Sequence, residues 1–275
     1  MVTRDRRERV LDALERMPPG VPVCLVDNAS ADGTAAAVRE RFPTVEVLEP
    51  GRNLGSAART LGARHLNMPF TAFADDDSWW APGALERAAA ALERFPRLAL
   101  VAARVLVGPQ QALDPTCAAM GAGGLPASGR PLPGPAVLGF VACGAIVRTS
   151  AFLSVGGFSP RYGIGGEERR LAADLAAAGW DLAYLEDVVA HHHPAREARP
   201  GRSWRVVRND VWSAWLDRPA GAAVRRTARV LAAAPPAVAL RAGAEAVRGL
   251  PWVLRERRVA PPEVQAALAH LEGDR

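Results

Sequence analysis

Short apolar runs alternate with longer amphipathic stretches through the first two thirds of the chain. The short runs are bounded by turn residues and predict strands at Val21–Val26, Val45–Leu48, Phe70–Ala74, Leu98–Val107 and Leu182–Leu185. The stretches between them predict helices at Arg6–Met17, 34–42, Ser56–Leu66, from Pro82, near Ser150 and at Glu167–Ala178. This alternation predicts an α/β fold, in which helices cover both faces of a mostly parallel sheet.

The alternation is interrupted once and then ends. Gly108–Pro135 is rich in glycine and proline, and so long a connection inside a domain is usually a binding loop, a lid or a disordered segment. After Pro200 the pattern is helical, with divisions predicted at Pro219, Pro235–Pro236, Pro251 and Pro261–Pro262. We therefore expect an α/β domain over residues 1–200 and a helical C-terminal extension over residues 201–275.

The composition excludes several classes of protein. A chain of 275 residues with 49% hydrophobic and 23% charged residues can bury a large core, which excludes general disorder. It has no run of about 18 apolar residues and no apolar segment at its charged start, so we expect a cytoplasmic protein. Cys24, Cys117 and Cys143 are far apart, which argues against a disulfide framework or a zinc site.

Charge is distributed unevenly along the chain. All 34 basic residues are arginine, which together with frequent alanine, glycine and proline indicates a high-GC coding sequence. Between Arg196 and Arg258 there are fourteen arginines and five acids, a local net charge of +9. Such a segment suits an anionic partner, namely a phosphate, a nucleic acid or an acidic lipid surface with the protein at its periphery. A solvated, arginine-rich helical face explains the same residues equally well.

Three consecutive acids carry the strongest chemical signal. Asp75, Asp76 and Asp77 directly follow a predicted strand, and open α/β sheets bind ligands at the carboxyl ends of their strands. Asp75 and Asp77 lie on the same side of an extended chain, so they can converge on one hard cation. A helix cap is the alternative, but a cap needs only one acceptor. Because three adjacent carboxylates repel one another without a cation, the pattern predicts a metal–diphosphate site.

A turn and several short motifs extend this prediction. Asp27 ends a predicted strand, where it could accept a hydrogen bond from a nucleobase or belong to an ordinary turn. The motifs follow one another along the chain as VDNASADGT (26–34), GRNLG (51–55), AR (58–59), ADDDS (74–78), VGGF (155–158), GEE (166–168), AGW (178–180) and HHH (191–193). In order and spacing they resemble family 2 glycosyltransferases of the GT-A type, over roughly residues 2–209. The resemblance implies a metal-dependent, inverting hexosyltransferase that uses a nucleotide-activated sugar.

The resemblance also implies which residues bind the donor nucleotide. These are Thr3, Asp27, Asn53, Arg59, Asp75 and Asp76. Among them, Asp27 would contact the base and Arg59 the base or the diphosphate. Asp75 and Asp76 would contact the ribose or the diphosphate.

A divalent metal is implied beside the donor. Asp75 and Asp77 would bind Mg²⁺ or Mn²⁺, and His192 would complete the metal shell. Because three histidines are adjacent, His191 and His193 are alternatives to His192. Histidines that follow a strand are also often solvated loop residues.

Glu167 and Glu168 stand where the family has its catalytic Glu-Asp pair, with Glu168 at the position of the aspartate. Both open a predicted helix, whose dipole favours the ionised form that a general base needs. The base would take the proton of the acceptor hydroxyl while the metal holds the departing diphosphate, which gives inversion. The alternative is that both glutamates only improve a helix N-terminus.

The start of the chain departs from the family pattern. Only Met1 and Val2 remain of the hydrophobic strand that normally precedes the segment matched by Thr3–Arg6. We expect this loss to leave backbone groups of neighbouring strands unpaired and the nucleotide pocket without one wall. It favours a second interpretation, a non-catalytic relative that binds a nucleotide sugar or a partner protein.

The expected partners are a nucleotide-diphosphate sugar and an acceptor that is a glycan, a lipid-linked molecule or a small molecule, but not a nucleic acid. The acceptor site would be built by the Gly108–Pro135 loop, the Gly139–Gly144 segment and the C-terminal helices. A sugar-nucleotide pyrophosphorylase would need a glycine-rich phosphate loop with a basic residue after its first strand, and the sequence has none. A phosphatase with an aspartate nucleophile would carry its acids after the first strand, which also does not fit.

Overall fold

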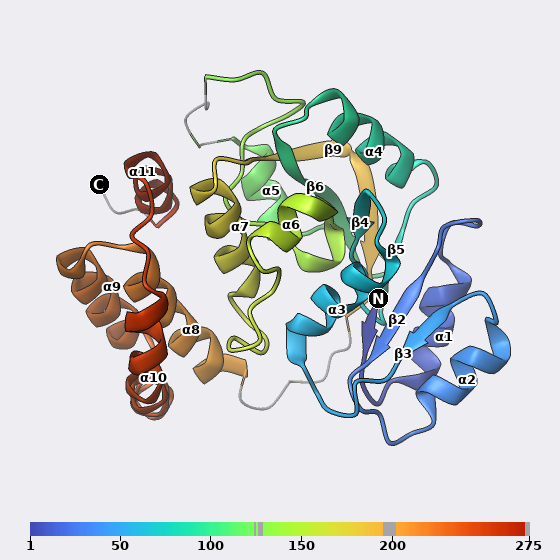
Figure 1. Ribbon diagram of the computed structural model, residues 1–275, viewed down its shortest axis with the longest axis horizontal. Coiled ribbons are helices and arrows are strands. Elements are labelled where there is room, and N and C mark those ends of the chain that lie inside the picture. The colour runs from blue at the N-terminus through green and yellow to red at the C-terminus, as the bar shows by residue number, and fades with distance from the viewer. Residues whose placement is uncertain (124, 126–128, 195–201, 273–275) are drawn as a thin grey trace.

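The chain folds into an α/β structure with a helical C-terminal part. A computed structural model describes residues 1–123, 125, 129–194 and 202–272. Figure 1 shows the strands in the middle of the molecule with helices packed around them, and the C-terminal helices gathered at one end. The expected α/β class with C-terminal helices is confirmed.

The first sheet contains three parallel strands in the order β1-β2-β3. Its elements are β1 (Val2–Thr3), α1 (Arg7–Glu15), β2 (Cys24–Asp27), α2 (Thr34–Arg41) and β3 (Glu46–Leu48). Every residue of β2 is buried, because the strand has a neighbour on each side and helices over its faces.

The first strand is short but it pairs fully with its neighbour. The backbone amides of Val26 and Asn28 each donate a hydrogen bond of 2.9 Å, to the carbonyls of Met1 and Thr3 respectively. On its other side Val2 bridges to Asp75, which links the first sheet to the second. The prediction of unpaired backbone groups and a missing pocket wall is therefore wrong.

The second sheet is mixed, in the order β4-β8-β6-β9-β5 with β7 beside β6. Its strands are β4 (Phe70–Ala72), β5 (Ser78–Trp80), β6 (Leu98–Val107), β7 (Ala112–Leu113), β8 (Ala145–Arg148) and β9 (Asp181–His192). Only β6 and β9 pair in parallel; the other neighbours in this sheet are antiparallel. The mostly parallel sheet that we expected is thus found only in the first sheet, because an apolar run does not show in which direction its strand runs.

The remaining helices before the C-terminal part are short. They are η1 (Gly55–Ala57), α3 (Ala58–Leu66), α4 (Ala84–Arg94), α5 (Pro115–Gly121), η2 (Ala142–Gly144), α6 (Thr149–Ser154) and α7 (Glu167–Ala177). Of these, α3 packs on β2 of the first sheet. The rings of Phe73, Phe152 and Phe158 lie 5.3–5.6 Å apart and join the end of β4 to α6. This aromatic cluster fixes the backbone that leads into the three aspartates.

The Gly108–Pro135 segment contains more regular structure than we expected. β7 forms a hairpin with β6, and α5 follows it directly. Asp114 caps α5, because its Oδ1 accepts a hydrogen bond of 2.7 Å from Thr116 N, and Pro115 occupies a position that favours proline. The Asp-Pro pair was a helix-start signal that the abundance of glycine and proline concealed.

Strand β9 is longer than predicted and contains two of the three consecutive histidines. It pairs with β6 through Leu185, shifts register, and continues to His192. The exposed residues Glu186 and Asp187 lie at this irregularity, which is why the sequence pattern suggested that the strand had ended. Because β9 also pairs with β5, His192 is placed opposite Ser78, next to the three aspartates.

Four helices form the C-terminal part of the chain. They are α8 (Arg202–Asp217), α9 (Ala220–Ala233), α10 (Pro236–Glu256) and α11 (Pro262–Leu271). The predicted division at Pro251 is wrong, because this residue lies inside α10 on its exposed side, where water can solvate the carbonyl that proline leaves unpaired. Among the described residues, no helix combines the length and apolarity needed to cross a membrane. The domain boundary at residue 200 stays a prediction.

Candidate active site

A cavity of about 940 Å³ opens at the ends of β1 and β4 and the start of α7. Most of the residues expected from the sequence line it, namely Thr3, Asn53, Arg59, Asp75, Asp76, Asp77, Glu167, Glu168 and His192. Asp27 does not line it. Its Oδ1 accepts a hydrogen bond of 2.8 Å from the amide of Ser30, so this carboxylate stabilises the turn after β2. Contact between Asp27 and a nucleobase stays a prediction.

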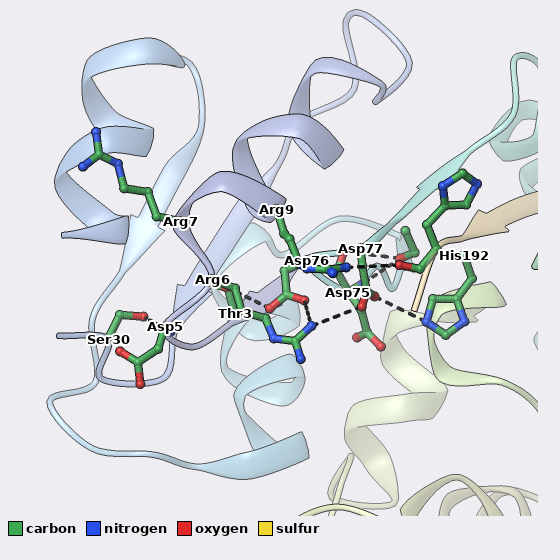
Figure 2. Close-up of polar contacts among 12 residues, drawn as sticks. Thr3, Asp5, Arg6, Arg7, Arg9, Ser30, Asp75, Asp76, Asp77 and His192 are labelled. Atoms are coloured by element: carbon green, nitrogen blue, oxygen red, sulfur yellow. Dashed lines mark hydrogen bonds and ion pairs between the residues drawn. The ribbon is translucent and has the colours of Figure 1, made fainter. Parts of the chain in front are cut away.

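Asp76 and Asp77 are buried and are held by residues of the N-terminal segment (Figure 2). Thr3 donates a hydrogen bond of 3.0 Å to Asp76 Oδ2. Arg6 Nη1 lies 3.5 Å from Asp76 Oδ1 and 3.3 Å from Asp77 Oδ2. Burial and the charge of Asp77 raise the pKa of Asp76 to about 6, although Arg6 opposes the shift. Sequence reasoning missed Arg6; its position three residues after Thr3 was the available signal.

His192 is the histidine that faces the aspartates. Its Nε2 lies 3.3 Å from Asp77 Oδ1, whereas His191 and His193 pack against the ring of Trp79 with centroids at 5.4 and 4.7 Å. This separation follows from the strand, because alternate side chains point to opposite faces. Burial lowers the pKa of His192, but its interaction with Asp77 raises the value overall.

Two side chains of the cavity, Asp77 and His192, are suitable ligands for a divalent cation. Asp77 Oδ1 is buried without a hydrogen bond of good geometry, next to the imidazole nitrogen of His192. A carboxylate oxygen and an imidazole nitrogen suit Mn²⁺, with the remaining ligands left to a diphosphate. Asp75 is instead ion-paired with Arg59. In the described part of the chain, no three His, Cys, Asp or Glu side chains form a complete metal site.

Arg59 and Ser56 leave hydrogen-bond donors unused on the cavity wall. Arg59 Nε and Ser56 Oγ are both buried without a hydrogen-bond partner among the described residues. Asp75, Glu168 and Glu167 raise the pKa of the Arg59 guanidinium although burial alone lowers it. Donors that are buried and unused cost free energy unless a ligand accepts from them. Together they suit the oxygens of a phosphate or a sugar.

The two glutamates at the start of α7 differ in their surroundings. Glu167 is 4% exposed and accepts a hydrogen bond from the amide of Gly165, so it closes the glycine-rich turn before the helix. Asn209 of α8 holds the same turn, because its side-chain amide donates to the carbonyls of Tyr162 and Gly165. Glu168 is half-buried on the cavity wall. Burial, supported by the charge of Glu167, raises the pKa of Glu168 to about 8.

This geometry distinguishes two roles that the sequence could not separate. Glu167 is fixed by the backbone of its own turn, whereas Glu168, which lines the same cavity, has its pKa raised to about 8. A carboxyl of this kind can hold or take up a proton near neutral pH. The role of Asn209 depends on the contact between α8 and the turn before α7, which no local sequence pattern shows.

The chain belongs to glycosyltransferase family 2. The family model described as "Glycosyl transferase family 2" matches residues 6–153. An N-acetylglucosaminyl-diphospho-decaprenol L-rhamnosyltransferase of Mycobacterium tuberculosis is 30% identical over 207 residues, which cover 64% of this chain and 67% of the relative. The prediction of a family 2 glycosyltransferase is confirmed.

Solved structures show the same fold. The mannosyltransferase PcManGT from Pyrobaculum calidifontis, in complex with GDP-Man and Mn²⁺, has a TM-score of 0.54 and 22% identity, covering 99% of this chain and 73% of that one. S. aureus TarS residues 1–349 has a TM-score of 0.57 and 16% identity, covering 84% of this chain and 68% of that one. GalNAc-T7 with UDP, GalNAc and Mn²⁺ has a TM-score of 0.57 and 14% identity, covering 80% and 47%. At these identities the likeness establishes the GT-A fold.

Proposed function

We propose that this glycosyltransferase is a metal-dependent, inverting enzyme that moves a hexosyl group from a nucleotide-diphosphate sugar to an acceptor hydroxyl. The observation that supports it most is the placement of Asp77, His192 and Glu168 on the wall of one cavity. A cation-binding pair and a carboxyl with a raised pKa then share the space in which a donor would lie. Residues 1–200 would form the catalytic part and residues 201–275 its helical extension.

The donor would lie along the N-terminal side of the cavity. Thr3, Asn53, Asp76 and the unused donors of Arg59 and Ser56 offer hydrogen bonds to its ribose and diphosphate. Asp77 and His192, with Asp75 once Arg59 turns to the phosphate, would hold Mg²⁺ or Mn²⁺, which when bound neutralises charge on the departing diphosphate. The solved relatives with GDP-Man or UDP and Mn²⁺ support this donor class.

Glu168 would act as the general base. Its carboxylate would accept the proton of the acceptor hydroxyl as that oxygen attacks the anomeric carbon from the side opposite the diphosphate. Glu167 would position it by holding the turn at Gly165, and Arg59 would support the ionised form through its positive charge. Attack from the opposite side gives inversion of the anomeric centre.

The mycobacterial relative supports one class of acceptor. A lipid-linked diphosphate is named in the mycobacterial relative, which supports a lipid-linked acceptor over a free glycan or a small molecule. A cytoplasmic protein at the periphery of a membrane would meet such an acceptor. Part of the acceptor site would come from Val141–Cys143 and from Ser203 and Val206 of α8, which line the same cavity as the glutamates.

Hydrolysis of nucleotide sugars in the presence of Mn²⁺ tests the proposal. We expect the wild-type chain to bind and slowly hydrolyse a nucleotide sugar. Asp77→Ala and Glu168→Gln should each abolish turnover, whereas only Asp77→Ala should weaken metal-dependent nucleotide binding. A wild-type chain that binds nucleotide sugars without any turnover would instead support the non-catalytic interpretation, which has lost its original argument because β1 is present. A chain that binds no nucleotide sugar at all contradicts both the catalytic and the non-catalytic interpretation.

A further inference from the structure

The outward face of α10 is apolar, unlike that of an ordinary surface helix. Leu240, Val247 and Leu254 are 78%, 64% and 56% exposed, and they are the most exposed large apolar side chains among the described residues. They are spaced by seven residues, so they form one row along the helix. Ala244 and Pro251, which are also exposed, lie within the same row. A helix that packs on a soluble protein normally presents polar residues on this side.

A second row on α10 is positively charged. Arg241, Arg248 and Arg255 are exposed and each follows a residue of the apolar row by one position. Both acids of α10 are ion-paired, Glu245 with Arg248 and Glu256 with Arg161. Residues 220–258 contain eight arginines and two glutamates. The helix therefore combines an apolar strip with a cationic margin, and we call these two rows the α10 surface.

The inner face of α10 prevents this helix from turning its apolar row inward. Ala242, Ala246, Gly249 and Val253 are buried against α8. A Cβ atom at Gly249 would lie 2.5 Å from the indole of Trp212, and Trp212 Nε1 donates a hydrogen bond of 3.1 Å to Ala246 O. Close packing of this kind holds the helix in one rotation, so the α10 surface lies on the side of the helix opposite α8. α10 itself lies among the C-terminal helices at one end of the molecule (Figure 1).

We propose that the α10 surface docks on an anionic lipid bilayer, with the helix lying in the plane of the interface. Leu240, Val247 and Leu254 would enter the boundary between headgroups and acyl chains, and the arginines would reach the lipid phosphates beside them. Amphipathic helices with this combination of an apolar strip and flanking arginine bind such surfaces, and each arginine adds attraction to anionic headgroups.

A second copy of the chain fits the same surface less well. In a symmetric antiparallel pairing of two α10 helices, the arginine row of one copy would face the arginine row of the other. Like charges opposed in this way destabilise an interface unless acids separate them, and α10 has no unpaired acid beside its arginine row. An anionic membrane supplies the complementary charge without this conflict.

The docking proposal rests on the proposed function in one respect: a lipid-linked acceptor would explain why the enzyme binds a membrane. The binding itself is measured without sugar transfer. Measurement of metal-dependent nucleotide binding in solution with the same proteins therefore distinguishes a failure of membrane docking from a failure of the donor site.

Co-sedimentation with vesicles tests the surface in the full chain. The vesicles are phosphatidylcholine alone or phosphatidylcholine with phosphatidylglycerol, at low and at physiological salt. The test variants are Leu240→Ser/Val247→Ser/Leu254→Ser and Arg248→Gln/Arg255→Gln. The matched control is Met68→Ser/Leu113→Ser, which removes two exposed apolar side chains outside α10. Circular dichroism and gel filtration establish that each variant is folded and show its oligomeric state.

We expect the wild-type chain to bind only vesicles that contain phosphatidylglycerol. The triple serine variant should lose on the order of a hundred-fold in affinity, because three apolar side chains no longer enter the interface. The double glutamine variant should lose on the order of twenty-fold at low salt, and the control should bind like the wild type. Wild-type protein that stays in solution at low salt, folded serine variants that bind unchanged, or a wild-type dimer that the triple variant converts to a monomer would each overturn the proposal.

Discussion

Two groups of charged residues, one on the cavity wall and one between α7 and the C-terminal helices, contain the same residue types in different proportions. The cavity wall carries five carboxylates and three arginines. In the second group, four carboxylates and four arginines form the arginine–carboxylate network, in which every carboxylate has an ion pair. Its members are Arg169, Arg170, Asp174, Asp210, Asp217, Arg218, Arg226 and Glu272.

The difference distinguishes the candidate active site from a group of charges that serves the structure. In the network each charge is offset by a neighbour, so nothing further is needed to keep it buried. At the cavity, carboxylates outnumber arginines, and burial raises the pKa values of Asp76 and Glu168 to about 6 and about 8. The cavity can therefore accept a further positive charge, such as a divalent cation, whereas every carboxylate of the network already has an arginine partner.

The largest effect expected is on catalysis. Glu168→Gln keeps the shape of the side chain but cannot accept a proton, so we expect kcat to fall by roughly 10²–10⁴-fold. Metal-dependent nucleotide binding should stay at the wild-type level, because this residue would not contact the diphosphate. Initial rates of transfer or donor hydrolysis, together with nucleotide titrations, measure both quantities. Equal loss of nucleotide binding and turnover would count against the role of a base.

Breaking the network should instead destabilise the fold. Arg170→Met leaves the buried Asp217 and the half-buried Asp174 without their shared arginine, and we expect the free energy of unfolding to fall by about 3–5 kcal/mol. The fraction that remains folded should still bind nucleotide with Mn²⁺. Urea unfolding followed by circular dichroism gives the loss.

A matched control for this variant is Arg39→Met, which removes an exposed ion pair with Glu49. We expect it to cost about 0–1 kcal/mol, because water solvates both partners. If Arg170→Met costs no more than Arg39→Met, the network does not stabilise the fold.

Stabilisation of the fold by a bound ligand should depend on the cavity residues and not on the network. A nucleoside diphosphate with Mn²⁺, at about a hundred times its dissociation constant, should stabilise the wild-type chain by about 2.7 kcal/mol. We expect Asp77→Ala to lose most of this gain and Arg170→Met to retain it. Thermal-shift curves with and without Mn²⁺ give the comparison, and an equal gain in Asp77→Ala would remove Asp77 from the metal site.

The smallest effect is the pH dependence of stability. The pKa of Glu168 is raised in the folded chain, so folding favours the protonated carboxyl. Its contribution to the free energy of unfolding is therefore lost as the pH rises from about 5 through about 8. We therefore expect the Tm of metal-free wild type to fall relative to Glu168→Gln over that interval. A constant difference in Tm across it would contradict the raised pKa. The rate of transfer should rise over the same interval as Glu168 ionises.

Most elements and most site residues could be predicted from the sequence because they depend on local patterns. The aspartates follow an apolar run, and the glutamates follow a glycine-rich turn, so each was visible within a few residues. What could not be predicted depends on distant contacts. Arg6 gains its role only because β1 lies beside the aspartates, and His192 was singled out by the pairing of β5 with β9. Strand direction and the two-residue β1 were misjudged for the same reason.

The most direct test of the central claim is a titration of the full chain with Mn²⁺ in the presence of a nucleoside diphosphate, followed by the electron paramagnetic resonance signal of free Mn²⁺. We predict that wild-type protein removes Mn²⁺ from solution at one site per chain only when the nucleotide is present, and that Asp77→Ala does not. If wild type and Asp77→Ala leave the same concentration of free Mn²⁺ with every nucleoside diphosphate, the cavity is not the metal-dependent donor site described here.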